Sequence, residues 1–516
     1  MSRKWAARGL AAVSVIGALT LTACSADAAG SAPSGASSAA PVEGGAMSIG
    51  LDREVPSLDP ADGAIVQQPV FVVANAIYEP LLAPGPGGTM VPGLAESVTA
   101  DATGLTWTIE LPEGLAFSDG SPLTADSVKL HLERLNDPAT QSAAAAQTAQ
   151  ITEMQVESDT TLVLTLTAPN ADFDAQFARA LGMVTSTTAN DEYGFPLGAG
   201  PYQVEKFVGG DSIIVVRNEN YGGDKTGHLD EIAYRMMPDA ESRLQSLQAG
   251  DLDLMWTEVT SQFQQARDDA SLTVHAAPAA VSSIMLNLQS PKFADHDVRE
   301  ALAQAIDRDA VNAVVNLGEG TPVDNPYALL GDLAPDVDYP QHDVAAAKQV
   351  LEGKNLAFDL TVNNRTETIQ RGTVLKDILS EVGVTVTLKP VDPAEFGAVL
   401  GANDFEAVDF VTSIYSDASG GLLTSRTGSP YNFGGYSDTS ADEMLDAAAG
   451  ETDAAERAVL LQGVAQNLAD NLPTLWLTAN NAGFIAQAEV AGMPNLDGFS
   501  LISVQPAEIG WREAQQ

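Results

Sequence analysis

The chain has 516 residues, of which 45% are hydrophobic and 18% charged, so it can bury a large core and by length should hold roughly two to four domains. Its 69 acidic and 25 basic residues give a formal charge of −44, which repels phosphate groups and argues against nucleic-acid partners. The single cysteine, Cys24, excludes an intramolecular disulfide, and the five histidines show no close spacing typical of metal ligands. We therefore expect no metal and no cofactor.

The amino terminus has the pattern of a signal peptide. Arg3, Lys4 and Arg8 precede a short apolar stretch at 9–21, and the sequence LTAC follows at 21–24. This end resembles the lipobox of bacterial lipoproteins, in which cleavage precedes the cysteine and a diacylglycerol is attached to its sulfur. The alternative is an ordinary secretory signal with a chance cysteine.

The lipobox predicts where the mature protein lies. We expect residues 1–23 to be removed, Cys24 to carry the lipid, and the segment 24–45, rich in Ala, Ser, Gly and Pro, to form a flexible tether. The folded body would then stand outside the cytoplasm, held at the cell membrane by its lipid anchor.

The first half of the body alternates predicted strands and helices. A short strand begins at Met47, Gly209-Gly210-Asp211 predicts a hairpin turn, and Gly250 is placed to end a helix. Apolar spacing predicts further strands at 107–111, 162–166 and 252–256, and helices at 70–82, 124–135 and 238–250.

The segment 281–315 predicts a strand followed by one helix. Ile284, Leu286 and Leu288 alternate with more polar positions, which is typical of a strand with one apolar face. Asp295 or Asp297 can cap a helix whose apolar residues recur every three or four positions up to Val315.

The second half repeats the same alternation. Helices are predicted at 344–351, 374–382 and 457–468 and from Pro393 onward, with strands at 358–362, 384–388, 407–413 and 474–478, the last of the chain. Such an order favours an α/β fold with two similar lobes and an extra β-rich segment in the first.

Several segments resemble one family, in its order along the chain. They are SLDPA (57–61), NAIYEPLLA (75–83), VPGLAES (91–97), WTIELPEGLAFSDGSPLTADSV (107–128), PLGAGPYQVEKF (196–207), RLQSLQAGDLDL (243–254), LNLQSPKFADHDVREALAQAIDR (286–308), YNFGGYSD (431–438) and LPTLWLT (472–478). Together they resemble the family 5 extracellular solute-binding proteins of ABC importers, the oligopeptide, dipeptide and nickel group.

The resemblance implies a periplasmic-binding-protein-like clamp of type II, similar to cluster C. Its first lobe would comprise 46–82, 194–275 and 480–516, with a small domain inserted at 83–193, and its second lobe would comprise 276–479. The lobes would close on the ligand by a hinge, and the monomer would dock on a membrane permease served by a cytoplasmic ATPase. In this scheme 281–315 enters the second lobe, so Leu286 and Leu288 should point inward and Asn287 should lie near the hinge or cleft rim.

The resemblance also suggests an acid that binds the ligand. Peptide binders of the family hold the α-ammonium group with the aspartate of an aspartate-tyrosine-x-x-proline motif. Here Tyr415 stands at that place and Asp417 follows two residues later. We expect Asp417 to pair a cation, the alternative being a loop acid that faces water. The departure leaves open whether the ligand is a peptide with a free amino terminus.

Five further residues are candidates for ligand contacts. Asn432 and Tyr436 match a family segment near the cleft, and Trp256 and Asn287 lie at predicted strand ends, where α/β clefts open. Aromatic rings there would cover ligand side chains, amides would bind peptide-like groups, and Arg426 could meet a carboxylate. Core, turn and solvated-loop roles are the alternatives.

The function predicted is a binding lipoprotein for import, with short peptides as its solute. Alternatives are a nickel chelate, an opine-like compound or an oligosaccharide, and a peptide sensor or chaperone. A secreted hydrolase is disfavoured, because the sequence contains no G-x-S-x-G, H-E-x-x-H or P-loop motif. The chain is therefore not expected to be an enzyme.

Overall fold

The computed structural model describes residues 40–85, 89–223, 227–328, 336–413, 424–429, 431–493 and 505–513. Cys24 and most of the expected tether lie outside these residues. The described end of the tether range is hydrogen-bonded to the body: Gly44 N donates to His228 O at 2.7 Å, and Val42 forms a β-bridge with Trp511.

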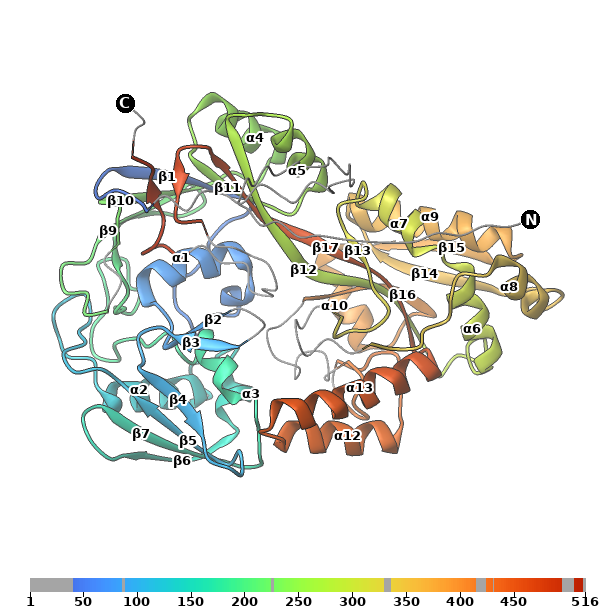
Figure 1. Ribbon diagram of the computed structural model, residues 1–516, viewed down its shortest axis with the longest axis horizontal. Helices are drawn as coiled ribbons and strands as arrows, with labels where there is room; N and C mark the ends of the chain where they lie inside the picture. Colours follow the sequence, from blue (N-terminus) through green and yellow to red (C-terminus); the bar gives the residue numbers. More distant parts are fainter. Residues whose placement is uncertain are drawn as a thin grey trace, which may run out of the picture. The chain divides into compact units, whose positions relative to one another are not determined.

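One large sheet organises residues 40–513 (Figure 1). Its strands, in spatial order, are β15 (Thr385–Val391), β14 (Ala357–Asn363), β16 (Ala407–Ser413), β12 (Leu272–Leu286), β17 (Thr474–Gln487), β11 (Leu254–Thr257), β1 (Ala46–Leu51), β10 (Glu231–Met236), β9 (Ser212–Arg217) and β8 (Tyr202–Val208), and β13 (Thr321–Pro322) pairs with β17.

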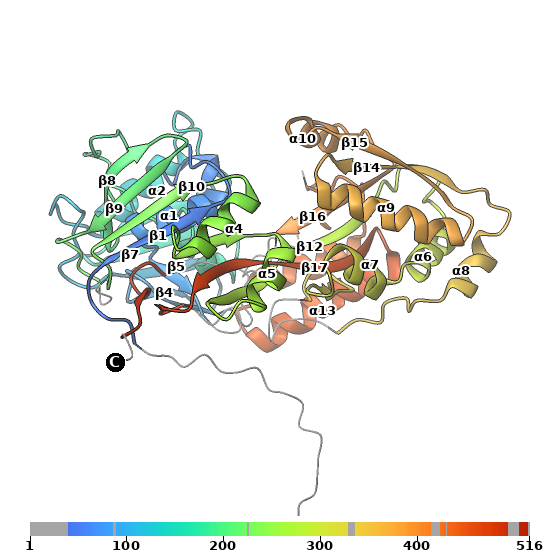
Figure 2. The ribbon, with the colours of Figure 1, turned by 90° about the horizontal axis from the view of Figure 1, so that it is seen from above.

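The long antiparallel pair β12–β17 joins two lobes (Figure 2). Along β12, Ala277 belongs to the first core cluster and Val281 to the second. Between them the register shifts at Pro278/Ala280, which is a β-bulge. Gly483 of β17 lies so close to β12 that an added Cβ would meet His275 O at 2.1 Å, so only glycine fits there.

The first lobe has one large core and a smaller separate apolar cluster. Large buried side chains of the large core include Trp256 and Tyr234 of the main sheet, Trp107 of a second, four-stranded sheet, and Phe173. That second sheet has the order β4 (Ser97–Ala100), β5 (Thr106–Glu110), β7 (Thr161–Leu166), β6 (Ile151–Val156). The other elements are η1 (Gly63–Val66), α1 (Gln68–Tyr78), β2 (Leu82–Pro84), β3 (Met90–Pro92), α2 (Ala125–Asn136), α3 (Ala145–Thr148), η3 (Phe173–Ala178), α4 (Ala240–Ala249), α5 (Thr260–Arg267), β18 (Val490–Ala491) and β19 (Gly510–Trp511).

The second lobe has a core of its own. Its helices are α6 (His296–Ala305), α7 (Arg308–Val315), α8 (Val344–Leu351), α9 (Thr366–Glu381), α10 (Pro393–Gly401), α12 (Thr439–Gly450) and α13 (Ala454–Asn471). The pair α12–α13 buries a small apolar cluster that includes Leu445, Leu461 and Leu468.

Most predicted elements are confirmed where the sequence carried a local signal. Asp211 lies in the β8–β9 turn, and Gly250 follows α4 with φ 79°. Leu286 is fully buried as expected, and Leu288 is partly buried against the second core.

Several predictions of helix and strand limits are wrong. The helix predicted at 374–382 begins at Thr366, and the strand of segment 281–315 begins at Leu272. The single helix to Val315 is two helices, because Asp307 leaves the helical conformation and caps α7 by accepting a hydrogen bond from Ala310 N at 3.0 Å. The helix predicted over 70–82 ends at Tyr78, since Glu79 has φ 37°. The strand expected to end at residue 478 continues to Gln487, and β18 and β19 follow it.

No helix among the described ranges is both long enough and apolar enough to span a lipid bilayer.

A buried ion pair ties α9 to β16. Arg371 Nε donates to Asp409 Oδ2 at 2.7 Å and Nη2 donates to Oδ1 at 2.6 Å, with side chains 2% and 0% exposed. Burial alone would lower the pKa of Arg371, but the charge and hydrogen bonds of Asp409 raise it above its ordinary value.

Asp409→Asn should therefore destabilise the protein by about 3–5 kcal/mol, because it leaves a buried guanidinium without its counter-charge. Urea unfolding measures the loss. The control is Asp359→Asn, which removes a solvent-exposed pair with Lys389 (3.5 Å) and should cost less than about 1 kcal/mol. Equal losses in the two variants would contradict the account.

Candidate ligand site

The first lobe gathers charged residues at one edge of its sheet. Strand β1 runs parallel to β10 and β11, so the three strands end on the same side. Asp52 and Arg53 follow β1, and Glu258 follows β11. Arg53 donates to Asp52 at 3.0 and 2.8 Å and lies 3.6 Å from Glu258. The carboxyl ends of parallel strands are where α/β proteins bind ligands.

The second lobe has a matching edge. Strand β14 runs parallel to both β15 and β16, and Asn363 is its last residue. Arg365 precedes the first turn of α9, which contains Glu367. The Oδ1 atom of Asn363 is buried and has no hydrogen-bond partner among the residues that the structure describes. This edge therefore offers both charges and a buried acceptor.

The two edges influence each other at Glu258. Desolvation raises the pKa of Glu258 above its ordinary value, although half of its side chain is exposed. Arg53 lowers this pKa, Asp52 raises it, and smaller effects come from Arg365 and Glu367 of the second lobe. Charges from both lobes therefore act on the pKa of Glu258.

An apolar surface adjoins the end of β16. The Phe410 and Phe433 rings are 6.0 Å apart, and Tyr431 lies 6.5 Å from Phe433, both in edge-to-face contact. Tyr431 is 52% exposed, and Phe410 and Phe433 are partly buried. A group of aromatic side chains that reaches the surface in this way is typical of binding surfaces.

Neither of two small cavities is of ligand size. One, of about 70 Å³, lies in the first lobe between Phe71 and Leu181. The other, of about 10 Å³, lies between Met285, Asn432 and Trp476. Ligand pockets usually measure about 300–1,000 Å³.

Trp256 and Asn287 are placed inside the framework. Trp256 is fully buried and packs edge-to-face on Phe484, with ring centres 5.1 Å apart. Asn287 follows β12; its Nδ2 donates to Phe405 O at 2.9 Å, and its Oδ1 accepts from Gln289 N at 3.0 Å. Both polar atoms of the Asn287 amide are therefore hydrogen-bonded to the protein itself.

Asn432, Tyr436 and Arg426 lie together in the loop before α12. Asn432 Nδ2 donates to Arg426 O at 3.0 Å and to Tyr436 O at 2.6 Å. The Tyr436 hydroxyl donates to Asn467, and burial raises its pKa. The Arg426 guanidinium pairs with Asp446. In this arrangement these polar groups hold the loop.

Tyr415 and Asp417, the residues expected to bind a ligand cation, lie outside the described residues. Arg53, Glu258 and Arg365, and the aromatic group of Phe410, Tyr431 and Phe433, were not predicted from the sequence. For the three charged residues, the usable signal was their position shortly after predicted strands.

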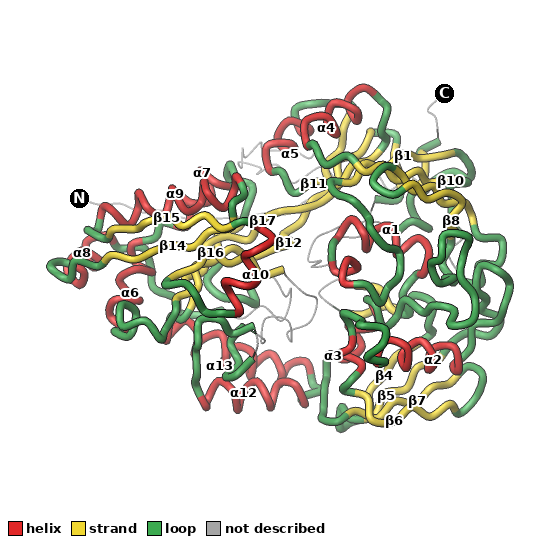
Figure 3. Tube along the Cα trace, turned by 180° about the vertical axis from the view of Figure 1, so that it is seen from behind, coloured by secondary structure: helices red, strands yellow, loops and turns green. Residues whose placement is uncertain are grey.

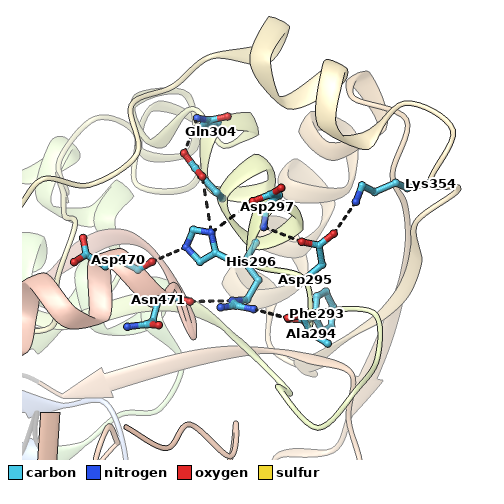
Figure 4. Close-up of polar contacts among 11 residues, drawn as sticks. Phe293, Ala294, Asp295, His296, Asp297, Gln304, Lys354, Asp470 and Asn471 are labelled. Atoms are coloured by element: carbon cyan, nitrogen blue, oxygen red, sulfur yellow. Dashed lines mark hydrogen bonds and ion pairs between the residues drawn. The ribbon is translucent and has the colours of Figure 1, made fainter. Parts of the chain in front are cut away.

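A surface group of possible metal ligands lies on α6 (Figure 4). His296 Nε2 donates to Asp470 O at 2.6 Å, and its Nδ1 lies 3.9 Å from Asp297 and 4.0 Å from Glu300. All three side chains are at least 43% exposed and belong to one helix. Exposed groups of this kind are common without a metal ion, so this one carries no argument for a metal site.

Comparison with known proteins identifies the family. Residues 89–433 match the family described as bacterial extracellular solute-binding proteins, family 5 Middle. The glutathione-binding protein GsiB of Escherichia coli (strain K12) is 26% identical over 413 residues, covering 75% of this chain and 80% of GsiB.

Solved structures show the same fold. The unliganded open form of MppA, a periplasmic murein tripeptide binding protein, has a TM-score of 0.78 at 18% identity and covers 92% of this chain and 99% of its own. DppA from Helicobacter pylori, in complex with the peptide STSA, has a TM-score of 0.73 at 20% identity, with coverages of 92% and 99%.

The fold is thus that of two-lobed periplasmic binding proteins, as the sequence predicted. The chain belongs to the bacterial extracellular solute-binding proteins, family 5. It is an extracytoplasmic solute-binding protein of the kind that serves ABC importers, and its relatives are transport proteins rather than enzymes.

The raised pKa of Glu258 predicts a pH dependence. Above the ordinary pKa of a glutamate, about 4.3, the unfolded chain releases a proton that the folded protein still holds, so stability falls as the pH rises. Glu258→Gln removes this fall. The stability of the variant minus that of wild type should therefore be larger near pH 7 than near pH 4. Thermal unfolding of both proteins at the two pH values measures this difference.

Glu406→Gln is a control of opposite sign. Burial alone would raise the pKa of Glu406, but hydrogen bonds from Lys292 and Asp359 N lower it. The ionised Glu406 therefore contributes to the stability of the folded protein above the ordinary glutamate pKa, and this contribution is lost as the pH falls. Its variant should therefore lose stability relative to wild type near pH 7. The same sign in both variants would refute this assignment of charges.

Proposed function

We propose that this protein captures short peptides between its two lobes and delivers them to the membrane permease of an ABC importer. The observation that carries the proposal is the match of residues 89–433 to the family, together with relatives that bind glutathione, a murein tripeptide and the peptide STSA. The clamp would act as a monomer.

The chemistry of the two strand edges supports a peptide. Asp52, Glu258 and Glu367 supply negative charge, and Arg53 and Arg365 supply positive charge. A short peptide is zwitterionic, so its two ends can meet both signs. Its backbone amide groups can hydrogen-bond to the strand ends, and its apolar side chains can cover exposed aromatic rings.

Two candidate residues are proposed to bind the ends of the peptide. Asp417 would pair the α-ammonium group, with Tyr415 two residues before it in sequence, and Arg426 would exchange its partner Asp446 for the ligand carboxylate. Asn287, Asn432, Tyr436 and Trp256 would act by shaping the loops and the core behind the site.

The ligand can be identified directly. Purify the protein without unfolding it and analyse bound small molecules by native mass spectrometry. We expect a mixture of short peptides. A single non-peptide mass, such as a nickel chelate, an opine or an oligosaccharide, would contradict the peptide proposal. Asp417→Ala should retain much less peptide, whereas Asp404→Ala, which removes an exposed acid before β16, should retain as much as wild type.

We also propose that Cys24 anchors the mature protein by a lipid, so that it works at the outer face of the cell membrane. The LTAC sequence after an apolar stretch supports this proposal. Cys24→Ala should release the protein into the medium or leave it unprocessed, as judged by fractionation and intact mass. Unchanged retention at the membrane would contradict it.

A further inference from the structure

The two lobes touch at the hinge, as their covalent connection requires. Beside the β12–β17 pair, Gln264 Nε2 of α5 donates to Leu317 O, which follows α7, at 3.1 Å. Arg267 of α5 pairs with Glu319 in the same turn. Because β12 and β17 hold these elements together, the contacts can persist when the lobes rotate.

A second contact between the lobes lies elsewhere. Figures 1 and 3 show the α12–α13 pair of the second lobe beside the four-stranded sheet of the first, away from the strands that cross between the lobes. Ala171 N donates to Ala449 O at 2.7 Å. Next to this bond, Arg457 Nη1 lies 2.5 Å from Asp172 Oδ1. We call these four residues the distal contact.

Local structure prepares both sides of the distal contact. Asn170 Oδ1 accepts a hydrogen bond from Asp172 N at 3.1 Å, which fixes the turn that presents Asp172. On the other side, Asp453 caps α13 by accepting from Ala455 N and Glu456 N. That cap begins the helical turn in which Arg457 stands.

Close approach of the two backbones depends on Gly450, the last residue of α12. An added Cβ at Gly450 would lie 3.2 Å from the Cβ of Pro169. This contact is tight, so a larger side chain at Gly450 would press against the segment that carries Ala171 and Asp172.

Asp172 supplies the counter-charge for the guanidinium of Arg457. The two side chains are 14% and 15% exposed, so the pair is largely removed from water. Arg457 stands in the first turn of α13, where the helix dipole disfavours a cation. Its Nε is buried and has no hydrogen-bond partner among the described residues. Without Asp172, the guanidinium would be better solvated if the lobes separated.

We propose that the distal contact is a latch that favours the arrangement of the lobes with the Asp172–Arg457 pair formed, and so sets how long a ligand stays bound. This inference rests on the proposed function, in which the ligand is held between the lobes. A contact that joins the lobes in the ligand-holding arrangement stabilises that arrangement against those in which the pair is broken, and therefore raises the apparent ligand affinity.

The test compares two charge-removing variants. Asp172→Asn breaks the latch between the lobes. Arg134→Gln breaks the Arg134–Asp59 pair, which is similarly part-buried, at 24% for each side chain, but lies within the first lobe. The exchange variant Asp172→Arg with Arg457→Asp restores the latch with reversed charges. Gly450→Val tests the same contact by steric means.

Two measurements are made on each variant. In a Cys24→Ser background the chain has no other cysteine, so spin labels at Glu113→Cys and Lys376→Cys report the distance between the lobes. Stopped-flow measurements with the probe tri-alanine report ligand dissociation. Asp172→Asn and Gly450→Val should lengthen or broaden the label distance and speed dissociation about tenfold. Arg134→Gln should change neither, and the exchange variant should recover both.

Equal label distances and dissociation rates in Asp172→Asn and Arg134→Gln would overturn the latch, as would a longer distance with unchanged dissociation. If the wild-type protein binds no peptide at all, the proposed function fails. The label distance still decides whether Asp172 and Arg457 hold the lobes together.

Discussion

The structure depends on one pair of antiparallel strands. Strands β12 and β17 run through both lobes, and each contributes side chains to both hydrophobic cores. Because the β-bulge at Pro278/Ala280 falls between the two cores, the backbone can bend there without breaking either one. A clamp needs this combination of two rigid bodies and a narrow connection.

The same sheet also fixes where a ligand can be held. Parallel strands in each lobe end in charged or polar residues, and Glu258 responds to charges from both lobes. The Arg371–Asp409 pair binds α9 to β16, so that Arg365 at the start of α9 is held in place relative to the end of β16. The distal contact would then favour the arrangement of the lobes in which the Asp172–Arg457 pair is formed. Rigidity within each lobe and weak preference between them are what a reversible binding protein requires.

Sequence reasoning predicted the parts of the fold that depend on local signals. The turn at Gly210 and the helix end at Gly250 follow from positive φ angles that few residues can adopt. The break at Asp307 was missed because its neighbours keep a helical spacing of apolar residues, and only the hydrogen bond to Ala310 N shows that it is a cap. The end of β17 was missed because Ala, Asn and Gly at 479–483 have low strand propensity, and pairing with β12 overrides it.

The site was predicted less well, because it depends on contacts between distant parts of the chain. Asn432 is an amide in a family motif, yet the structure uses it to hold its own loop. Nothing in the sequence around Glu258 and Arg365 distinguishes them from other charged residues. Only the fold brings the two sheet edges close enough for Arg365 to affect the pKa of Glu258. No local pattern marks Asp172 and Arg457 as partners.

Hydrogen–deuterium exchange with and without a bound peptide tests the central claim most directly. If the ligand is held between the lobes, it should protect the ends of β1 and β11 in the first lobe and of β14 and β16 in the second, together. Protection confined to one lobe, or absent from all four strand ends, would contradict the account.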